Sequence, residues 1–286
     1  MALPRVLILR APGTNCDVET AFAFEKAGAK AERLHVFRLL ENPQLCRTYQ
    51  IFCIPGGFSY GDDIAAGRIL ANQIRLHLAD LLREFVESGK LILGICNGFQ
   101  VLVKSDVLLP PTQEGLAQAT LTWNDSRRFE DRWVRLAVTG RPCVFLEGIQ
   151  ELYLPVAHAE GKFVARDIAT LQALESAGLL VLRYARLTGP LRVESQLIPY
   201  PENPNGSQAN VAGLCDSTGR ILGLMPHPER HIDPTHHPHW TRRLSARLEG
   251  LSAHCPSPES SPSCFRPPAA EGDGLRLFKN AVRYFA

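Results

Sequence analysis

The chain has 286 residues, of which 45% are hydrophobic and 21% are charged, and its formal net charge is +2. These values fit one globular α/β domain over residues 1–286, or such a domain with a tail, and give no reason to expect a nucleic-acid or anionic-membrane partner. No apolar run reaches the roughly 20 residues that span a bilayer and no signal peptide is recognisable, so a soluble, cytoplasmic protein is expected.

The first part of the chain alternates short apolar runs with helical stretches. Strands are predicted at residues 5–9, 31–36 and 51–54, with a helix at residues 17–26. This alternation is typical of a parallel sheet with helices on both faces. Because ligands of such sheets collect at the carboxyl ends of the strands, one rim is expected to gather the loops after Leu9, Ile54, Ile95 and Met225.

Two glycines, Gly56 and Gly57, directly follow the third predicted strand. They leave bare backbone there, so an N–H can point at a developing oxyanion, with a second N–H supplied by Asn97. An ordinary glycine turn is the alternative, and two glycines by themselves do not exclude it. Beyond this loop, apolar residues recur at helical spacing over residues 69–85, which predicts one helix with a buried face.

The stretch LILGICNGFQ, residues 91–100, predicts a strand, a sharp turn and a helix. Cys96 stands between Gly94 and Gly98, the small neighbours that a strained strand-to-helix turn needs. The N-terminus of the following helix favours a thiolate over a thiol, so the pattern predicts a nucleophile. A buried packing cysteine is the alternative interpretation.

A base for this nucleophile is predicted in the sequence PHPE, which follows a strand at residues 221–225. Pro226 and Pro228 keep the segment extended, and residues two apart in an extended chain point to the same side. His227 and Glu229 therefore share a face, where the carboxylate can orient the imidazole as in a catalytic triad. A proline-rich surface turn is the alternative. Other segments predict additional elements: strands at residues 116–122, 133–138 and 179–184, and helices at residues 167–177 and 274–285.

Residues 231–270 are rich first in histidine and then in proline and serine, with little that could build a core. They predict a flexible, proline-rich insertion near the C-terminus. The spacings of their histidines and cysteines do not match usual zinc-binding arrangements, so no metal site is expected. The eight cysteines of the chain lack a repeating spacing, which favours reduced thiols over a disulfide framework.

Six motifs follow one another between residues 6 and 230: APGTNCD, PGGFSYGDD, GICNGFQVL, AHAEGKF, NPNGS and GLMPHPER. Together they resemble the glutamine-amidotransferase subunits (PurQ-type) of phosphoribosylformylglycinamidine synthase. G-x-C-x-G alone would indicate only class I glutamine amidotransferases or related cysteine hydrolases. The resemblance implies a flavodoxin-like, doubly wound, mostly parallel sheet of the class I glutamine amidotransferase type.

The resemblance also implies a glutaminase subunit of de novo purine biosynthesis. Cys96 would attack the carboxamide of L-glutamine, forming a glutamyl thioester and releasing ammonia. His227 would be the general acid and base, and Glu229 its orienting partner.

Further positions carried over from the family surround this triad. The N–H groups of Gly57 and Asn97 would form the oxyanion hole, and Gln100 would help to hold the glutamine. His158 and Glu160 are expected near the site, without an assigned role. Three positions depart from the family pattern and put fine specificity and partner contacts in question: Ala11, Asp63 and Ala159.

The chain has no G-x-x-x-x-G-K-[ST] motif and no G-x-G-x-x-G after a strand, so no cofactor is expected on it. ATP and Mg are expected on a large synthetase subunit (PurL-like), which receives the ammonia by a sheltered path, with a small bridging subunit (PurS-like) as the second partner. Two alternatives remain: a class I amidotransferase subunit serving another acceptor, and a catalytically silent glutamine-binding regulatory subunit.

Overall fold

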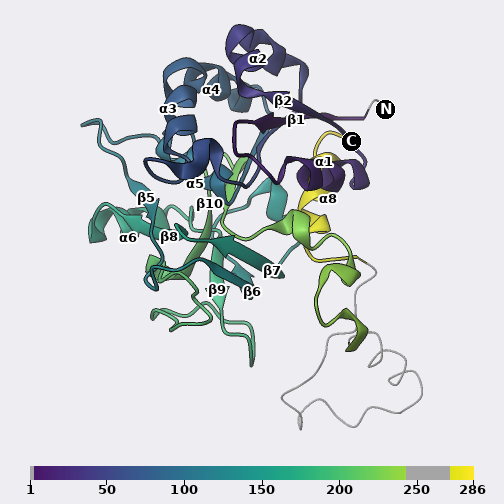
Figure 1. Cartoon of the computed structure of the whole chain (residues 1–286). Coiled ribbons are helices and arrows are strands. Elements are labelled where there is room, and N and C mark those ends of the chain that lie inside the picture. The colour runs from purple at the N-terminus through teal and green to yellow at the C-terminus, as the bar shows by residue number, and fades with distance from the viewer. Residues whose placement is uncertain (1–2, 243–270) are drawn as a thin grey trace.

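The computed structural model describes residues 3–242 and 271–286. In this part of the chain, nine strands form one sheet in the order β2-β1-β3-β4-β11-β10-β9-β6-β7, and β5 and β8 form a separate antiparallel pair (Figure 1). The strand bounds are β1 Arg5–Arg10, β2 Lys30–His35, β3 Ile51–Ile54, β4 Leu91–Ile95, β5 Ala119–Thr122, β6 Glu130–Val138, β7 Glu151–His158, β8 Lys162–Ala165, β9 Leu182–Ala185, β10 Val211–Cys215 and β11 Ile221–Leu224.

The half of the sheet from β2 to β11 is parallel, as the alternating pattern predicts. Every residue of β3, β4 and β11 is buried, so these strands read as continuous apolar runs. β4 pairs with β3 on one side and with β11 on the other. The chain leaving the carboxyl ends of these three strands therefore meets on one rim, as expected for Ile54, Ile95 and Met225.

The other half of the sheet, from β11 to β7, is antiparallel. In this half, the predicted strands at residues 133–138 and 179–184 correspond to β6 and β9 with shifted ends, whereas β7 and β10 were not predicted. In the separate pair, the predicted strand at residues 116–122 corresponds to β5, whereas β8 was not predicted. Gly213 weakens the strand pattern of β10, where an added Cβ would lie 2.8 Å from the Gly223 carbonyl oxygen. This half brings the end of β7 next to the rim.

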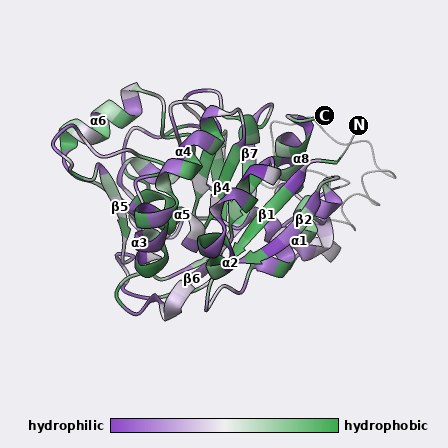
Figure 2. Ribbon diagram, turned by 90° about the horizontal axis from the view of Figure 1, so that it is seen from above, coloured by the Kyte–Doolittle hydropathy of each residue, from purple (hydrophilic) through white to green (hydrophobic). Residues whose placement is uncertain are grey.

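The helices cover the parallel strands on both sides. α1 and α8 lie together on one side, where Phe24 and Phe278 meet edge to face at 4.8 Å between ring centroids, and α3 and α5 lie on the other (Figure 1, Figure 2). No helix of the described residues is both long and apolar enough to cross a membrane. The helix bounds are α1 Asp17–Lys26, α2 Val36–Glu41, α3 Arg68–His77, α4 Ala79–Glu87, α5 Asn97–Lys104, α6 Ile168–Ser176 and α8 Leu275–Arg283.

The single helix predicted at residues 69–85 is two helices, α3 and α4. Leu78 separates them with φ −128° and is 1% exposed, so it packs into the core outside helical geometry. The apolar spacing continues through the break without a glycine or proline. The prediction of one helix was wrong because a tertiary contact sets this boundary.

The start of the predicted insertion at residues 231–270 is packed. His231 and His237 are buried, and the ring centroid of His237 lies 4.4 Å from that of Trp133 and 5.5 Å from that of Tyr153. The boundary at residue 231 was therefore placed too early, since these histidines contact strands β6 and β7. Residues 243–270 of the predicted insertion lie outside the described residues.

Candidate active site

Cys96 occupies the sharp turn between β4 and α5 that the sequence predicts. Its φ of 50° and ψ of −104° are strained for a residue with a side chain, and its N–H donates to the Leu224 carbonyl of β11 at 2.8 Å. Its Sγ lies 3.7 Å from the Ala157 carbonyl oxygen at the end of β7, and 5% of the residue is exposed. The turn thus presents the sulfur where β4, β7 and β11 end.

The two flanking glycines are required by close contacts. A Cβ added to Gly94 would lie 2.5 Å from Leu102 Cδ1, and one added to Gly98 would lie 1.8 Å from the Ile54 carbonyl oxygen. Helix α5 therefore packs directly on the backbone of β3, and this contact fixes the turn that holds Cys96.

We expect Gly98→Ala to lower the free energy of unfolding by at least ~2 kcal/mol, because the new methyl group must push the end of β3 away from α5. Denaturant titration of the full chain measures this loss. Gly115→Ala is a suitable control, since no atom lies within 4 Å of the added Cβ and the only destabilising effect is the backbone strain of its φ of +76°. Equal losses in the two variants would contradict the packing argument.

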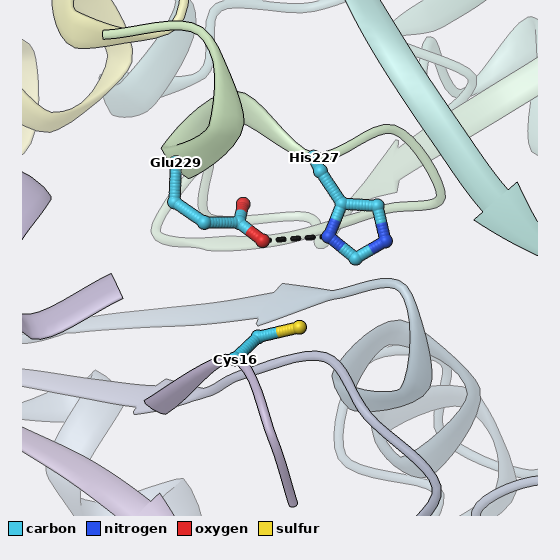
Figure 3. Close-up of side chains that lie close together, drawn as sticks. All are labelled: Cys16, His227 and Glu229. Atoms are coloured by element: carbon cyan, nitrogen blue, oxygen red, sulfur yellow. Dashed lines mark hydrogen bonds and ion pairs between the residues drawn. The ribbon is translucent and has the colours of Figure 1, made fainter. Parts of the chain in front are cut away.

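His227 and Glu229 form the predicted hydrogen-bonded pair, but the prediction of an extended backbone was wrong, because Pro228–Arg230 forms a 3₁₀ turn. The Nδ1 of His227 lies 2.6 Å from Glu229 Oε1 (Figure 3), and the two residues are 2% and 1% exposed. The N–H of His227 donates to the Pro155 carbonyl of β7 at 2.8 Å, which holds the segment against the sheet. The Nε2 of His227 has no hydrogen-bond partner in the described residues, so it is available for proton transfer.

The backbone of Gly56 shows how closely these groups converge. A Cβ added there would lie 2.8 Å from His227 Cε1, 3.5 Å from Cys96 Cβ and 3.1 Å from Cys16 Sγ. The ends of β3, β4 and β11 and the start of α1 thus bring four distant segments to one point. Cys96, His227 and Glu229 are brought together, as the triad hypothesis requires.

The electrostatics of His227 follow from its surroundings. Burial by itself would lower its pKa, but the Glu229 carboxylate, the Cys96 sulfur and contact with the Cys16 thiol raise it, and the net result is a pKa well above the usual range. The group therefore keeps its proton near neutral pH, and that proton is lost only as the pH rises through the raised pKa.

Two backbone donors lie beside this group. The N–H groups of Gly57 and Asn97 donate to no other group in the described part of the chain. Gly57 has a φ of +136°, a backbone conformation that favours glycine. Asn97 is the first residue of α5, directly after Cys96. Both predicted oxyanion donors are thus free to bind a ligand oxygen.

Both ends of the Gln100 amide are hydrogen-bonded within the protein. Its Nε2 donates to the Glu160 carbonyl at 2.6 Å and its Oε1 accepts from Asn97 Nδ2 at 3.0 Å. Glu160 in turn accepts from the N–H of Ala66 at 3.2 Å. Gln100 therefore ties α5 to the loop after β7, and its Nε2 and Oε1 each keep the capacity for one more hydrogen bond.

His158 is neutral, and it lies close enough to His227 for the charge of that imidazole to affect its pKa. Burial and that charge lower its pKa to about 3, and its Nδ1 pairs with Asn124 Oδ1 at 3.1 Å. Asn124 Oδ1 also accepts from the N–H of Gly161, so it is the acceptor and Nδ1 carries the hydrogen. His158 cannot serve as a second acid near neutral pH.

Cys16 is a site residue that the sequence analysis did not single out. Figure 3 shows its sulfur pointing toward the His227–Glu229 pair. The signals for it were its position in the loop after β1, one of the four loops expected on this rim, and its place in the motif APGTNCD. No neighbouring glycine pattern marks it as functional.

Cys16, His227 and Glu229 offer ligand atoms within 4.8 Å of one another, a spacing that would suit a metal ion. The surrounding groups favour a proton between His227 and Glu229 over a metal ion. The 2.6 Å separation of Nδ1 and Oε1 is that of a hydrogen bond, and Arg230 Nη2 lies 3.1 Å from Cys16 Sγ, where its positive charge opposes a bound cation.

Comparisons with known proteins identify the family of the chain. The family model of the CobB/CobQ-like glutamine amidotransferase domain matches residues 3–285. Curated proteins named phosphoribosylformylglycinamidine synthase subunit PurQ are similar over 99% of this chain and 98% of their own length, with 45% identity in Dehalococcoides mccartyi and 40% in Methanococcus maripaludis. A solved structure of PurLQS from Thermotoga maritima aligns over 100% of both chains, with 26% identity and a TM-score of 0.66. The chain therefore belongs to the PurQ family of glutamine amidotransferases.

Proposed function

We propose that this chain is the glutaminase subunit of phosphoribosylformylglycinamidine synthase in de novo purine biosynthesis. The observation that carries the proposal is the meeting of Cys96 with the buried His227–Glu229 pair around the backbone of Gly56. A strained nucleophile, a base with a free Nε2 and an orienting carboxylate are the parts that acyl transfer requires.

In the first half-reaction, Cys96 attacks the carboxamide carbon of L-glutamine. His227 already holds the shared proton at Nε2, so the sulfur attacks as a thiolate; the carbonyl oxygen gains negative charge, and the N–H groups of Gly57 and Asn97 bind that oxygen. The tetrahedral intermediate collapses as His227 gives its Nε2 proton to the leaving nitrogen. The C–N bond breaks, ammonia leaves, and a glutamyl thioester remains on Cys96.

In the second half-reaction, His227 removes a proton from water, which attacks the thioester carbon. The C–S bond breaks, the sulfur leaves as a thiolate, His227 keeps the proton that it took from water, and glutamate leaves. Glu229 holds the imidazole by Nδ1 through both halves, so Nε2 faces the reacting atoms. Gln100 holds Asn97 and the loop after β7 in place by its two hydrogen bonds.

Ammonia has to reach its acceptor without meeting bulk water, where it would be protonated and lost as a nucleophile. The structure from Thermotoga maritima is described as PurLQS. By analogy, we assign a PurL-like synthetase subunit and a PurS-like small subunit as partners. The synthetase would bind ATP and Mg and amidate formylglycinamide ribonucleotide, while this chain binds glutamine and no cofactor.

A glutamine-mimicking electrophile tests the assignment of the nucleophile. The full chain, assembled with its synthetase and small subunits, is expected to be labelled at Cys96 alone and to lose glutamine-dependent amidation as label accumulates. Peptide mass spectrometry locates the label. Labelling at another cysteine, or full labelling of Cys96 without loss of activity, would refute the assignment.

The same assembly tests the acceptor. It is expected to amidate formylglycinamide ribonucleotide with ATP and either glutamine or an ammonium salt. An assembly that releases glutamate from glutamine but amidates only a different acceptor would place the chain with another class I amidotransferase.

A further inference from the structure

Arg230 lies next to Glu229 but does not bond to it. Its Nε is 4.0 Å from Glu229 Oε1, whereas it donates to Glu19 Oε1 of α1 at 3.3 Å and, through Nη2, to Cys16 Sγ at 3.1 Å. Guanidinium groups bind carboxylates strongly, often by two parallel hydrogen bonds. The long separation from Glu229 therefore needs a cause.

Glu229 has an acceptor to offer. Its Oε2 is buried and has no hydrogen-bond partner in the described residues, while Oε1 is bonded to His227. An unpaired buried acceptor is costly, so a nearby guanidinium free to move would bind it. The hydrogen bonds of Arg230 to Cys16 and Glu19 keep its guanidinium away from the Glu229 carboxylate.

Cys16 is firmly fixed and well suited to accept. Its N–H donates to the Gly56 carbonyl at 3.3 Å, and its carbonyl accepts from the N–H of Thr20 at 3.1 Å. Its thiol donates to Asn15 Oδ1 at 3.2 Å, which leaves the sulfur lone pairs for Arg230. The residue is 1% exposed and burial raises the pKa of its thiol, so the sulfur remains a neutral acceptor.

We propose that Cys16 is a positioning residue for the active site: its sulfur restrains the Arg230 guanidinium so that the Glu229 carboxylate stays committed to His227. The proposal rests on the proposed glutaminase function and adds a role for a residue outside the triad. Besides its direct contact with His227, Cys16 acts through Arg230 and Glu229, and it forms no bond with glutamine.

The proposal predicts how activity depends on pH. The protonated imidazole of His227 donates to the leaving nitrogen, so activity falls as the pH rises through the raised pKa of His227. A guanidinium that closes on Glu229 brings positive charge nearer and weakens the hydrogen bond to Nδ1, and both effects lower that pKa. The titratable groups that face the His227–Glu229 pair are Cys16, Glu19, Cys53, Cys96, His158 and Arg230.

The test is the pH profile of glutamine hydrolysis by the full chain assembled with its synthetase and small subunits. Cys16→Ala should move the alkaline limb to lower pH by roughly 0.5 unit. Cys16→Val, which fills the space without an acceptor, should do the same, and it replaces the alanine variant if that one fails to assemble. Cys16→Ser keeps an acceptor and should leave the limb in place, as should Cys46→Ala, which removes an equally buried sulfur elsewhere.

Arg230→Met separates this role from simple packing. Removing the guanidinium should move the alkaline limb to higher pH, and Cys16→Ala should then add only the smaller shift that comes from losing its direct contact with His227. The positioning role would be overturned if the alkaline limb stays unmoved in Cys16→Ala and Cys16→Val. It would also be overturned if Cys16→Ala shifts the limb as far in the Arg230→Met background as it does in the wild type. A wild-type assembly that forms no glutamate would instead refute the proposed function itself.

Discussion

Replacing Cys96 by alanine is expected to reduce glutamine-dependent amidation by at least ~10⁴-fold, because no other group can form the thioester. Amidation from an ammonium salt is expected to continue, since the ATP-dependent step belongs to the synthetase partner. The measurement compares the two nitrogen donors in the reconstituted assembly.

Cys46→Ala is the matched control for this variant. It also removes a buried sulfur, but from the 3₁₀ segment Pro43–Thr48, away from the rim. We expect it to keep both activities. Loss of the ammonium-dependent reaction in Cys96→Ala would point to a damaged assembly, and retention of the glutamine-dependent reaction would remove Cys96 from the mechanism.

Glu229→Gln is expected to lower the turnover number for glutamine by roughly 10²–10⁴-fold, because an amide holds the imidazole in place without stabilising its protonated form. The carboxylate is one of the groups that raise the pKa of His227 above its usual range. Its removal lowers that pKa, so the alkaline limb of the pH profile should move to lower pH.

The surface pair Glu147–Arg283 supplies the control, since both side chains are largely exposed. Glu147→Gln is expected to change turnover less than about twofold, because exposed ion pairs contribute little. A Glu229→Gln enzyme with wild-type turnover and an unmoved alkaline limb would show that the carboxylate does not act on His227.

The parallel half of the sheet could be predicted because it depends on local signals. Continuous apolar runs at β3 and β4 and the spacing of Gly94, Cys96 and Gly98 mark a buried strand, a turn and a helix without reference to the rest of the chain. The PHPE segment gave the right pair for the wrong reason, since His227 and Glu229 meet across a 3₁₀ turn at Pro228–Arg230 and not along an extended strand.

The antiparallel half and the role of Cys16 depend on contacts between distant residues. β10 contains Gly213 and pairs with β11 and β9, so its strand character comes from its neighbours. Cys16 meets Arg230 across 214 positions of the chain, which no local pattern encodes. The break at Leu78 is of the same kind, because the apolar spacing runs through it unchanged.

The use of Gln100 also depends on tertiary structure. The family resemblance implies that Gln100 helps to hold the glutamine, and in the structure its amide bridges Asn97 and the Glu160 carbonyl. Only the loop after β7, which was not predicted as part of the sheet, supplies that carbonyl.

Trapping the acyl intermediate tests the central claim most directly. The assembled complex is mixed with isotopically labelled glutamine, quenched in acid within the first turnovers and digested for mass spectrometry. The account predicts a labelled glutamyl group on the peptide that contains Cys96, removable by hydroxylamine as a thioester is. Labelled glutamate formed at the normal rate, with no glutamyl group on Cys96 at any quench time, would contradict it.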